Sequence, residues 1–534
     1  MPLTKKIIAF TFFTVLFFSV FSGCIFDNLF GGTEFSLSSL TIIDDEGFPG
    51  LSIVFSCTGT VTLKLYNSRS RLIDSDFYFK GDHDIVLYIE EFKNSVTSGS
   101  YRLRVYDNEN KEIYSKTINI GGSELSILSC EQKWWKRETG GYSLFGLSLN
   151  VYNNGDIPVY PYDLKIKIDI ETIKSLVLPS VVLPGEMKDI DCFIYRESEP
   201  DDSTFSIDLR DIDKNILASH SFSVDIVDNV PVKKFTWSYR GAKQVIIPIS
   251  EDLYDYYNDH ERLSIEDYSA YIFDPYDDQY IDILNDVLLS GFSGTNDNDI
   301  INYAVSFIQS LEYKTDSKNN GSYEYPNYPL ETIFTDNGGG DCEDKAIITA
   351  HLLKNMGYNV SLLRFTNHMA VGVNLSDDVI PTYDFYIDGY YFLETTTGGK
   401  PCGFIPSEYR ELASEVIIHP VSDRPLLDHS WENGTITIYT STERGDFVKV
   451  TLFVENLGSS LADNIIVEAG FFTDYEVKLN HITETINLLE PGMKEKVVLT
   501  VNIPKSITTW FKTRIYLGDE IVDVKESVSS FPTK

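Results

Sequence analysis

The sequence predicts a multidomain protein in which one α+β domain lies among three all-β sandwiches. The chain has 534 residues, which is too long for a single hydrophobic core. Runs rich in β-branched and aromatic residues, separated by turn clusters, occupy both ends of the chain. Apolar residues at helical spacing appear in the middle. We therefore expect a processed leader at 1–24, a spacer at 25–33, β-sandwiches at 34–121, 122–228 and 425–534, and the α+β domain at 229–424.

Two of the predicted sandwiches share an internal sequence repeat. Val151–Gly155 matches Val454–Gly458, and Leu183–Gly185 matches Leu489–Gly492 in the same order. The order holds although the loops differ in length, which indicates two copies of one sandwich. These segments resemble the immunoglobulin-like modules of prokaryotic cell-surface proteins. Because they carry no cluster of reactive side chains, we expect them to serve as spacers and packing units.

The charge of the chain excludes one class of partner. The formal net charge is −36, so the protein repels the phosphates of nucleic acids and we expect no nucleic-acid partner. The acidic residues are spread along the chain rather than gathered in one tail, which is typical of a solvated surface.

The N-terminus has the pattern of a secretory signal. Lys5 and Lys6 precede the apolar run Ile7–Val20, and small residues lead to Cys24. The run is short for a stable membrane span. The small residues before Cys24 resemble the lipobox of prokaryotic lipoproteins, which implies lipid attachment at Cys24, although Phe21 departs from the usual aliphatic residue. An uncleaved anchor and plain secretion are the alternatives. All three predict an extracytoplasmic protein, and the first two tether it to the membrane.

The other five cysteines do not form a disulfide framework or a zinc site. They are odd in number, widely spaced and without a CxxC motif. Cys130 and Cys192 lie in one predicted sandwich and could pair. We see no ligand spacing for zinc or calcium, so we predict no metal and no cofactor.

Cys342 has the sequence setting of a nucleophile at the start of a helix. The glycine run Gly338–Gly340 and Asp341 precede it, and apolar residues recur at helical spacing until Gly357. In the first turn, unpaired backbone N–H groups and the positive end of the helix dipole should favour a thiolate. The alternative is a packed cysteine near a helix start.

Two further residues can complete a nucleophile–base–orienter arrangement. His368 begins a predicted strand, Met369–Leu375, and Glu394 ends another that starts at Tyr390. Two more predicted strands follow, Thr382–Ile387 and the strand that ends at Glu394. An Asp-Gly turn joins them and favours a hairpin. Sulfur attacks a carbonyl, imidazole carries the proton, and a carboxylate orients the imidazole.

Three motifs of this segment resemble those of the transglutaminase-like superfamily, in its prokaryotic extracytoplasmic form. They are Gly340–Ala346, Asn367–Val371 and Tyr391–Thr396. The resemblance implies a papain-like core with a catalytic triad. It makes Cys342 the nucleophile and His368 the base.

The third member of that triad is a departure from the family pattern. The family usually has Asp where this chain has Glu394, which is one methylene longer but can still accept from an imidazole N–H. Asp384 and Asp388 are rivals, although the hairpin turn explains Asp388 better. For the oxyanion we expect the backbone N–H of Cys342 as one donor and leave the second unassigned between Gln309 and Tyr325.

The resemblance implies a thiol enzyme that acts on amide bonds of a protein or peptide through an acyl-enzyme. Hydrolysis and amine crosslinking share the first step, and the prokaryotic members favour hydrolysis. The alternative is a catalytically silent surface module that binds or adheres through the same cleft.

Overall fold

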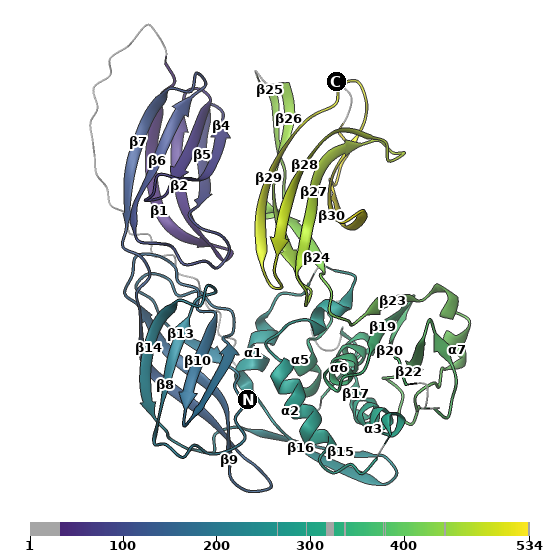
Figure 1. Cartoon of the computed structure of the whole chain (residues 1–534). Coiled ribbons are helices and arrows are strands. Elements are labelled where there is room, and N and C mark those ends of the chain that lie inside the picture. Colours follow the sequence, from purple (N-terminus) through teal and green to yellow (C-terminus); the bar gives the residue numbers. More distant parts are fainter. Residues whose placement is uncertain are drawn as a thin grey trace, which may run out of the picture.

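The computed structural model describes residues 32–531, apart from 264, 295, 317–324, 336–337, 377–378, 380 and 443–444. The predicted leader, Cys24 and most of the spacer lie outside the described residues. Among the described residues, none of the helices combines the length and the apolar character that crossing a membrane requires. The chain forms three β-sandwiches and one domain of helices and strands, as the sequence predicts (Figure 1).

The first sandwich consists of two antiparallel sheets, with the orders β1-β2-β5 and β4-β3-β6-β7. Residues alternate between buried and partly exposed along β2 and β3, so one face of each sheet meets in a shared core. The strands are β1 (Phe35–Asp45), β2 (Phe48–Cys57), β3 (Val61–Tyr66), β4 (Leu72–Tyr78), β5 (Gly81–Tyr88), β6 (Gly99–Asp107) and β7 (Glu112–Ile120).

The second sandwich has the sheet orders β12-β9-β8 and β11-β10-β13-β14. The strands are β8 (Leu125–Lys136), β9 (Tyr142–Asn153), β10 (Asp163–Ile168), β11 (Glu171–Leu176), β12 (Met187–Cys192), β13 (Thr204–Arg210) and β14 (Ile216–Ser223). Cys130 and Cys192 are both free thiols, so the pairing that the sequence left open does not form. Cys192 is buried in the core, where its thiol donates to the carbonyl of Leu176 at 3.2 Å.

The C-terminal sandwich also consists of two sheets. In the first, β26 pairs with β24, β25 and β29, and the second has the order β28-β27-β30-β31. Its elements are β24 (Leu427–Trp431), η3 (Glu432–Gly434), β25 (Thr437–Thr442), β26 (Gly445–Asn456), β27 (Ala462–Phe472), β28 (Lys478–Leu489), β29 (Lys494–Asn502), β30 (Trp510–Leu517) and β31 (Glu520–Glu526).

The sequence repeat corresponds to a repeated hydrogen-bond arrangement. Buried Asn153 donates to the carbonyls of Ile157 and Val182, and its side-chain oxygen accepts from Gly155 N. In the C-terminal sandwich, buried Asn456 donates to Ser460 and Leu489, and its oxygen accepts from Gly458 N. A Cβ on Gly155 or Gly458 would lie 2.4 or 2.3 Å from a backbone oxygen, which explains why both copies have glycine there.

The four units contact one another in a closed cycle (Figure 1). The N-terminal and C-terminal sandwiches lie side by side, and Lys449 forms an ion pair with Asp76 across 373 positions of sequence. One contact from each of the four junctions is Ser95–Asp211, Phe145–Tyr280, Asp423–Ser459 and Phe48–Phe453. The α+β domain is thus held from two sides by sandwiches.

The α+β domain places helices against a five-stranded antiparallel sheet of order β21-β22-β20-β19-β23. A hairpin, β15–β16, begins the domain, and a short parallel pair, β17–β18, lies before the cysteine helix α6. The elements are β15 (Val232–Ser238), β16 (Ala242–Pro248), α1 (Glu251–Asp259), η1 (Tyr268–Ile272), α2 (Asp278–Leu289), α3 (Asp297–Ser310), β17 (Glu312–Tyr313), α5 (Pro329–Phe334), β18 (Gly339–Gly340), α6 (Cys342–Asn355), β19 (Val360–Phe365), β20 (His368–Val373), β21 (Tyr386–Ile387), β22 (Tyr390–Leu393), α7 (Ser407–Arg410), η2 (Ala413–Glu415) and β23 (Ile417–Pro420).

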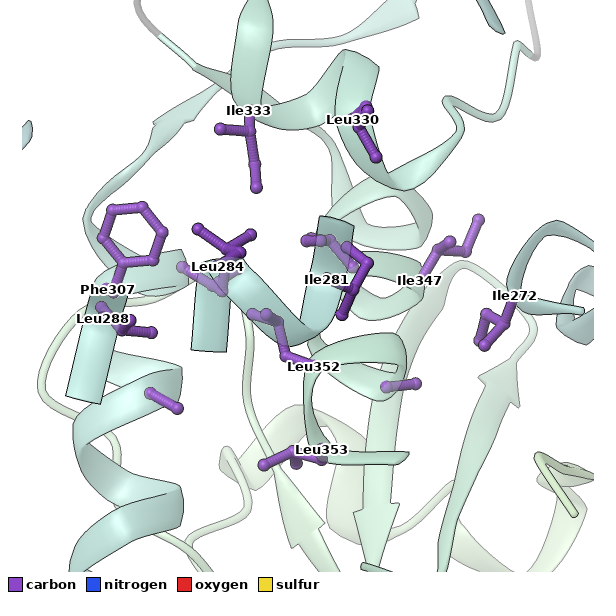
Figure 2. Packing of buried hydrophobic residues seen from close by; sticks show 14 of the residues in the cluster. Ile272, Ile281, Leu284, Leu288, Phe307, Leu330, Ile333, Ile347, Leu352 and Leu353 are labelled. Atoms are coloured by element: carbon purple, nitrogen blue, oxygen red, sulfur yellow. The ribbon is translucent and has the colours of Figure 1, made fainter. Parts of the chain in front are cut away.

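Helix α6 is the centre of this domain and is buried along most of its length. It packs against α2, α3, α5 and η1 on one side and against β19 and β20 on the other. Side chains from η1, α2, α5 and α6 lie together in Figure 2, namely Ile272, Ile281, Leu284, Leu330, Ile333, Ile347 and Leu352. Burial of these aliphatic side chains fixes the helix that carries Cys342.

One predicted strand is much shorter than expected. The sequence predicts a strand over Thr382–Ile387, but β21 contains only its last two residues. The N–H of Phe385 donates to the carbonyl of Gly403 instead of joining the ladder with β22, because the loop after β22 returns to this edge. The hairpin turn itself is as predicted, with Asp388 and Gly389 at φ 47° and 87°.

Candidate active site

The start of α6 is fixed by a capping box. Asp341 is the N-cap, its side chain accepts from the backbone of Asp344, and the Asp344 carboxylate accepts from Asp341 N at 3.1 Å. Asp344 also accepts from the backbone N–H and the side-chain amide of Asn327, at 2.7 and 2.8 Å. Cys342 is therefore the first residue of the helix, where the sequence places it.

The glycines before Cys342 allow a close backbone approach. Gly339 pairs with Glu312 in the parallel β17–β18 ladder. A Cβ on Gly339 would lie 2.2 Å from the carbonyl oxygen of Glu312, and one on Gly340 would lie 2.2 Å from a carboxylate oxygen of Asp344. Only glycine permits this path, in which β18 runs beside β17 and leads into α6.

The Cys342 thiol is half-buried and is held between two groups. It donates to Glu343 Oε2 at 3.1 Å, and the backbone N–H of Met369 donates to its sulfur. Burial raises the pKa of the Cys342 thiol, and the charge and hydrogen bond of Glu343 raise it further. The expected thiolate is thus not the favoured form here, because desolvation and adjacent carboxylates outweigh the helix N-terminus and the Met369 N–H.

His368 is the first residue of β20 and lies at the edge of the site. Its Nε2 is 3.3 Å from Glu394 Oε2, and the imidazole is buried. The Tyr409 ring, from α7, stacks on the imidazole with a centroid distance of 4.2 Å and an interplanar angle of 9°. The described residues include no hydrogen bond between the Cys342 thiol and the His368 ring; the sulfur instead accepts from Met369, the next residue along the strand.

Glu394 follows directly after β22 and is only 1% exposed. Its Oε1 accepts from Thr396 N at 2.8 Å, from the Thr396 hydroxyl, and from Thr397 N at 3.3 Å. Burial alone would raise the pKa of Glu394, but the hydrogen bonds and charge of His368 and the bonds from Thr396 lower it to about 2. The carboxylate is therefore ionised and oriented.

The rivals for the third position lie elsewhere. Asp384 and Asp388 are both exposed, and Asp388 occupies the hairpin turn. The structure brings Glu394, and neither rival, to His368.

Gln309 does not take the role of second oxyanion donor that the sequence left open for it. Its amide nitrogen donates to the carbonyls of Glu394 and Lys400, both at 2.8 Å, and its amide oxygen accepts from Gly399 N at 3.0 Å. These bonds occupy the amide, so Gln309 fixes the backbone around Glu394 instead of facing an oxyanion. The other candidate, Tyr325, stacks its ring against the Arg262 guanidinium at 4.0 Å.

The sequence reasoning missed three residues of this site: Tyr409, Glu343 as the thiol's partner, and buried Lys345. Tyr409 lies far along the chain in a short helix, where no periodic pattern marks it. Glu343 and Lys345 stand next to the predicted nucleophile. Their charges, within a helix expected to be buried, were the signal that could have identified them.

Two groups of side chains in the described part of the chain bring potential metal-ligand atoms within 4.8 Å of one another. One consists of Asp341, Cys342 and Glu343, and the other of Asp316, Asp341 and Asp344. Neither group has a ligand spacing that is recognisable in sequence. In both groups, oxygens of Asp341 or Asp344 already accept hydrogen bonds that fix the start of α6.

A scan against protein-family models and a search of curated proteins find no match for this chain. Among solved structures, red sea bream transglutaminase is a distant structural match at 10% identity, covering 72% of this chain and 80% of that one with a TM-score of 0.20. A β-glucuronidase from glycoside hydrolase family 2 matches at 12% identity over 33% of this chain and 21% of that one, with a TM-score of 0.17. The YadV chaperone matches at 8% identity over 36% of this chain and 99% of that one, with a TM-score of 0.13. The chain spans about a fifth of the β-glucuronidase, and likenesses this distant carry no argument about chemistry.

Proposed function

We propose that this protein is a thiol enzyme that cleaves amide bonds of a peptide or protein, with Cys342 as nucleophile, His368 as base and Glu394 as orienting carboxylate. The observation that carries the proposal is the contact between Glu394 and His368. The Glu394 carboxylate is ionised and hydrogen-bonded, and its Oε2 lies 3.3 Å from His368 Nε2. The next residue of the strand, Met369, donates its backbone N–H to the Cys342 sulfur. A buried carboxylate oriented on an imidazole beside a helix-borne thiol is the arrangement that nucleophilic acyl transfer needs.

The reaction begins from a thiol, because the Cys342 proton lies on sulfur at rest. His368 Nδ1 takes this proton while sulfur attacks the substrate carbonyl carbon, and the C=O π electrons move to oxygen. The backbone N–H of Cys342, unpaired at the first position of α6, stabilises the oxyanion. Collapse of the intermediate breaks the C–N bond, and His368 returns the proton to the leaving amine. Water, deprotonated by His368, then attacks the thioester carbonyl. Collapse of this second intermediate breaks the C–S bond and releases the acid, and His368 returns the proton to sulfur.

Hydrolysis is the outcome that we favour over transfer to an amine, on the resemblance of the three motifs to prokaryotic transglutaminase-like proteins.

We also propose that Cys24 carries a lipid and holds the domains outside the cytoplasm. The pattern of Lys5, Lys6, the apolar run and the small residues before Cys24 supports this location.

One observation favours a second candidate, a catalytically silent module that binds peptides at the same site. The Cys342 thiol bonds to Glu343, and burial and carboxylate charge raise its pKa, which is unlike an activated nucleophile. A binding module has no need of a thiolate.

Trapping an acyl-enzyme from a peptide library distinguishes the two. We expect intact-mass analysis of the full-length protein to show an adduct that maps to Cys342, is absent in C342A and is strongly reduced in H368A. C402A, which removes a buried thiol of the same domain, is the control and should keep the adduct. Peptide retained equally by C342A, with no adduct and no turnover, would show the binding module instead.

A further inference from the structure

A tyrosine ring lies flat on the imidazole of the proposed base, and the mechanism above gives this ring no part. The centroids of the Tyr409 and His368 rings are 4.2 Å apart, and the two ring planes differ by 9°. Among the ring pairs of the described residues, none is closer to parallel. The face of a phenol ring is electron-rich and attracts a positive charge that lies over it. The contact therefore suits an imidazole that becomes charged.

The Tyr409 ring reaches His368 because both faces of the central sheet are covered. Successive residues of a strand point to opposite faces of the sheet. In β20, Met369 packs in the large core that contains α6, whereas Ala370 packs in a second, smaller cluster. His368 lies two residues before Ala370 and so shares the face of that cluster. The buried members of the cluster are Leu363, Phe365, Ala370, Phe392 and Ile405, and Tyr409 and Leu412 pack against it.

The position of the Tyr409 ring is fixed by its own loop and by the strand next to β20. The backbone N–H of Tyr409 donates to the carbonyl of Pro406 at 3.2 Å, and its carbonyl accepts from Leu412 N at 3.1 Å. Buried Phe365 pairs with His368 in the ladder between β19 and β20. The Phe365 ring lies 5.7 Å from the Tyr409 ring and 6.4 Å from the imidazole, centroid to centroid. The loop is thus packed on the strands that carry the base.

The proposed reaction requires His368 to carry a positive charge. Burial and the neighbouring Glu343 raise the pKa of the Cys342 thiol, so transfer of its proton to the imidazole is costly, and any group that stabilises the imidazolium speeds this step. Glu394 contacts the imidazole at Nε2, and Tyr409 lies on its face. Burial, followed by the charge of Glu394, raises the pKa of the Tyr409 phenol above 10.0. The phenol is therefore neutral near pH 7 and offers an uncharged π face.

We propose that Tyr409 is a positioning residue of this site: its ring holds the imidazole of His368 in place and stabilises the imidazolium that forms when Cys342 is acylated. The catalytic consequence rests on the proposed function, but the action of the Tyr409 ring on the charge of His368 does not. Tyr409 acts through His368 and contributes no reacting atom.

Hydrogen exchange at the imidazole C2 position tests this action in the full-length protein without a substrate. Its rate against pH, followed by mass spectrometry of the peptide that contains His368, gives a midpoint for protonation of that ring. Y409F keeps the aromatic ring, whereas Y409L and Y409M cover the same face without one. We expect Y409L and Y409M to lower the midpoint by about 0.5–1 pH unit, and Y409F to change it by less than about 0.2. A midpoint that fails to fall in either Y409L or Y409M, or that falls equally in Y409F, would overturn the proposal.

The matched control is L412A, which loosens the same segment without removing a ring. Its midpoint should equal that of wild type. A fall in L412A as large as that in Y409L would show that loosening of the loop causes the effect, and would overturn the proposal. His481, which is exposed in the C-terminal sandwich, is the internal reference and should exchange alike in all variants.

A second readout measures the catalytic consequence. We expect single-turnover acylation by a trapping peptide to be about threefold to tenfold slower in Y409L, which is the rate equivalent of the expected midpoint shift, and Y409F to recover most of the rate. Acylation of Y409L at the wild-type rate would overturn the positioning role. If wild type forms no acyl-enzyme, the proposed function fails, while the exchange midpoints still decide whether Tyr409 acts on His368. If wild type is acylated and the midpoints do not fall, the proposed function stands and this inference fails.

Discussion

His368 Nε2 lies 3.3 Å from Glu394 Oε2, and the carboxylate that makes this contact is held by Thr396, by Thr397 and, through its backbone, by Gln309. The imidazole can therefore turn little, with Tyr409 stacked on its face. This fixed pair is the part of the site on which the proposed chemistry depends, whereas the thiol is directed to Glu343 at rest.

Replacing Glu394 by glutamine should remove the charge that supports an imidazolium during acylation. We expect the acylation rate to fall by about a hundredfold or more, since positioned acid–base catalysis contributes that much. Single-turnover acylation with a trapping peptide measures the rate. D388N changes an exposed carboxylate in the hairpin turn and should acylate like wild type. An unchanged rate in E394Q would remove Glu394 from the proposed machinery.

Replacing Glu343 by glutamine should make the thiol more acidic. The glutamate charge and its hydrogen bond to sulfur add to the effect of burial in raising the pKa of Cys342, so their loss lowers it. We expect the pH midpoint of iodoacetamide alkylation at Cys342 to fall by about one unit or more. Buried Cys402 serves as an internal reference and should stay unmodified. A midpoint that rises or stays constant contradicts this assignment.

Gln309 offers a test of how the site is held. Q309L keeps the volume of the side chain but leaves the carbonyls of Glu394 and Lys400 without their donor. We expect about 1–3 kcal/mol of local destabilisation for each orphaned buried group. Hydrogen exchange in residues 390–400 measures it, and acylation should slow as well. S310A, which removes a hydroxyl bonded within α3 itself, is the neighbouring control.

Lys345 should make stability depend on pH in a predictable direction. Its pKa is lowered by burial from its ordinary value of 10.5 to about 8. Between these two pH values the unfolded chain binds more protons at this site than the folded one, so stability of wild type relative to K345M rises with pH. We expect K345M to be the more stable at pH 7 and to lose up to about 3 kcal/mol of that advantage by pH 10.5. Thermal unfolding of both proteins across this range measures the difference, which K354M should not show.

The buried asparagine of the C-terminal sandwich should be required for its stability. N456A removes the donors to Ser460 and Leu489 and the acceptor of Gly458 N. Because these groups are buried, we expect a loss of about 2–4 kcal/mol, seen as lower exchange protection of β26 and β27. N480A, at an exposed position of β28 in the same sandwich, should change protection little.

Local features of this protein could be predicted from the sequence. The cysteine helix, its capping acid and its stop at Gly357 follow from apolar spacing and end signals that act within a few residues. The Asp388–Gly389 turn follows in the same way from its backbone preference. The repeated Asn-x-Gly segments likewise gave two equivalent turns, because the same local bonds form in both.

The state of the site was decided only by tertiary structure. Desolvation of Cys342, and the orientation of its thiol toward Glu343, outweigh the helix dipole that predicted a thiolate. Gln309 and Glu394 meet across 85 positions, and Lys345 reaches the end of α3 across 34. Burial and charge at such places depend on which elements pack together. A sequence pattern therefore predicts which residues are reactive. The protonation state of each residue, and the hydrogen bonds that hold it, depend on contacts between distant segments.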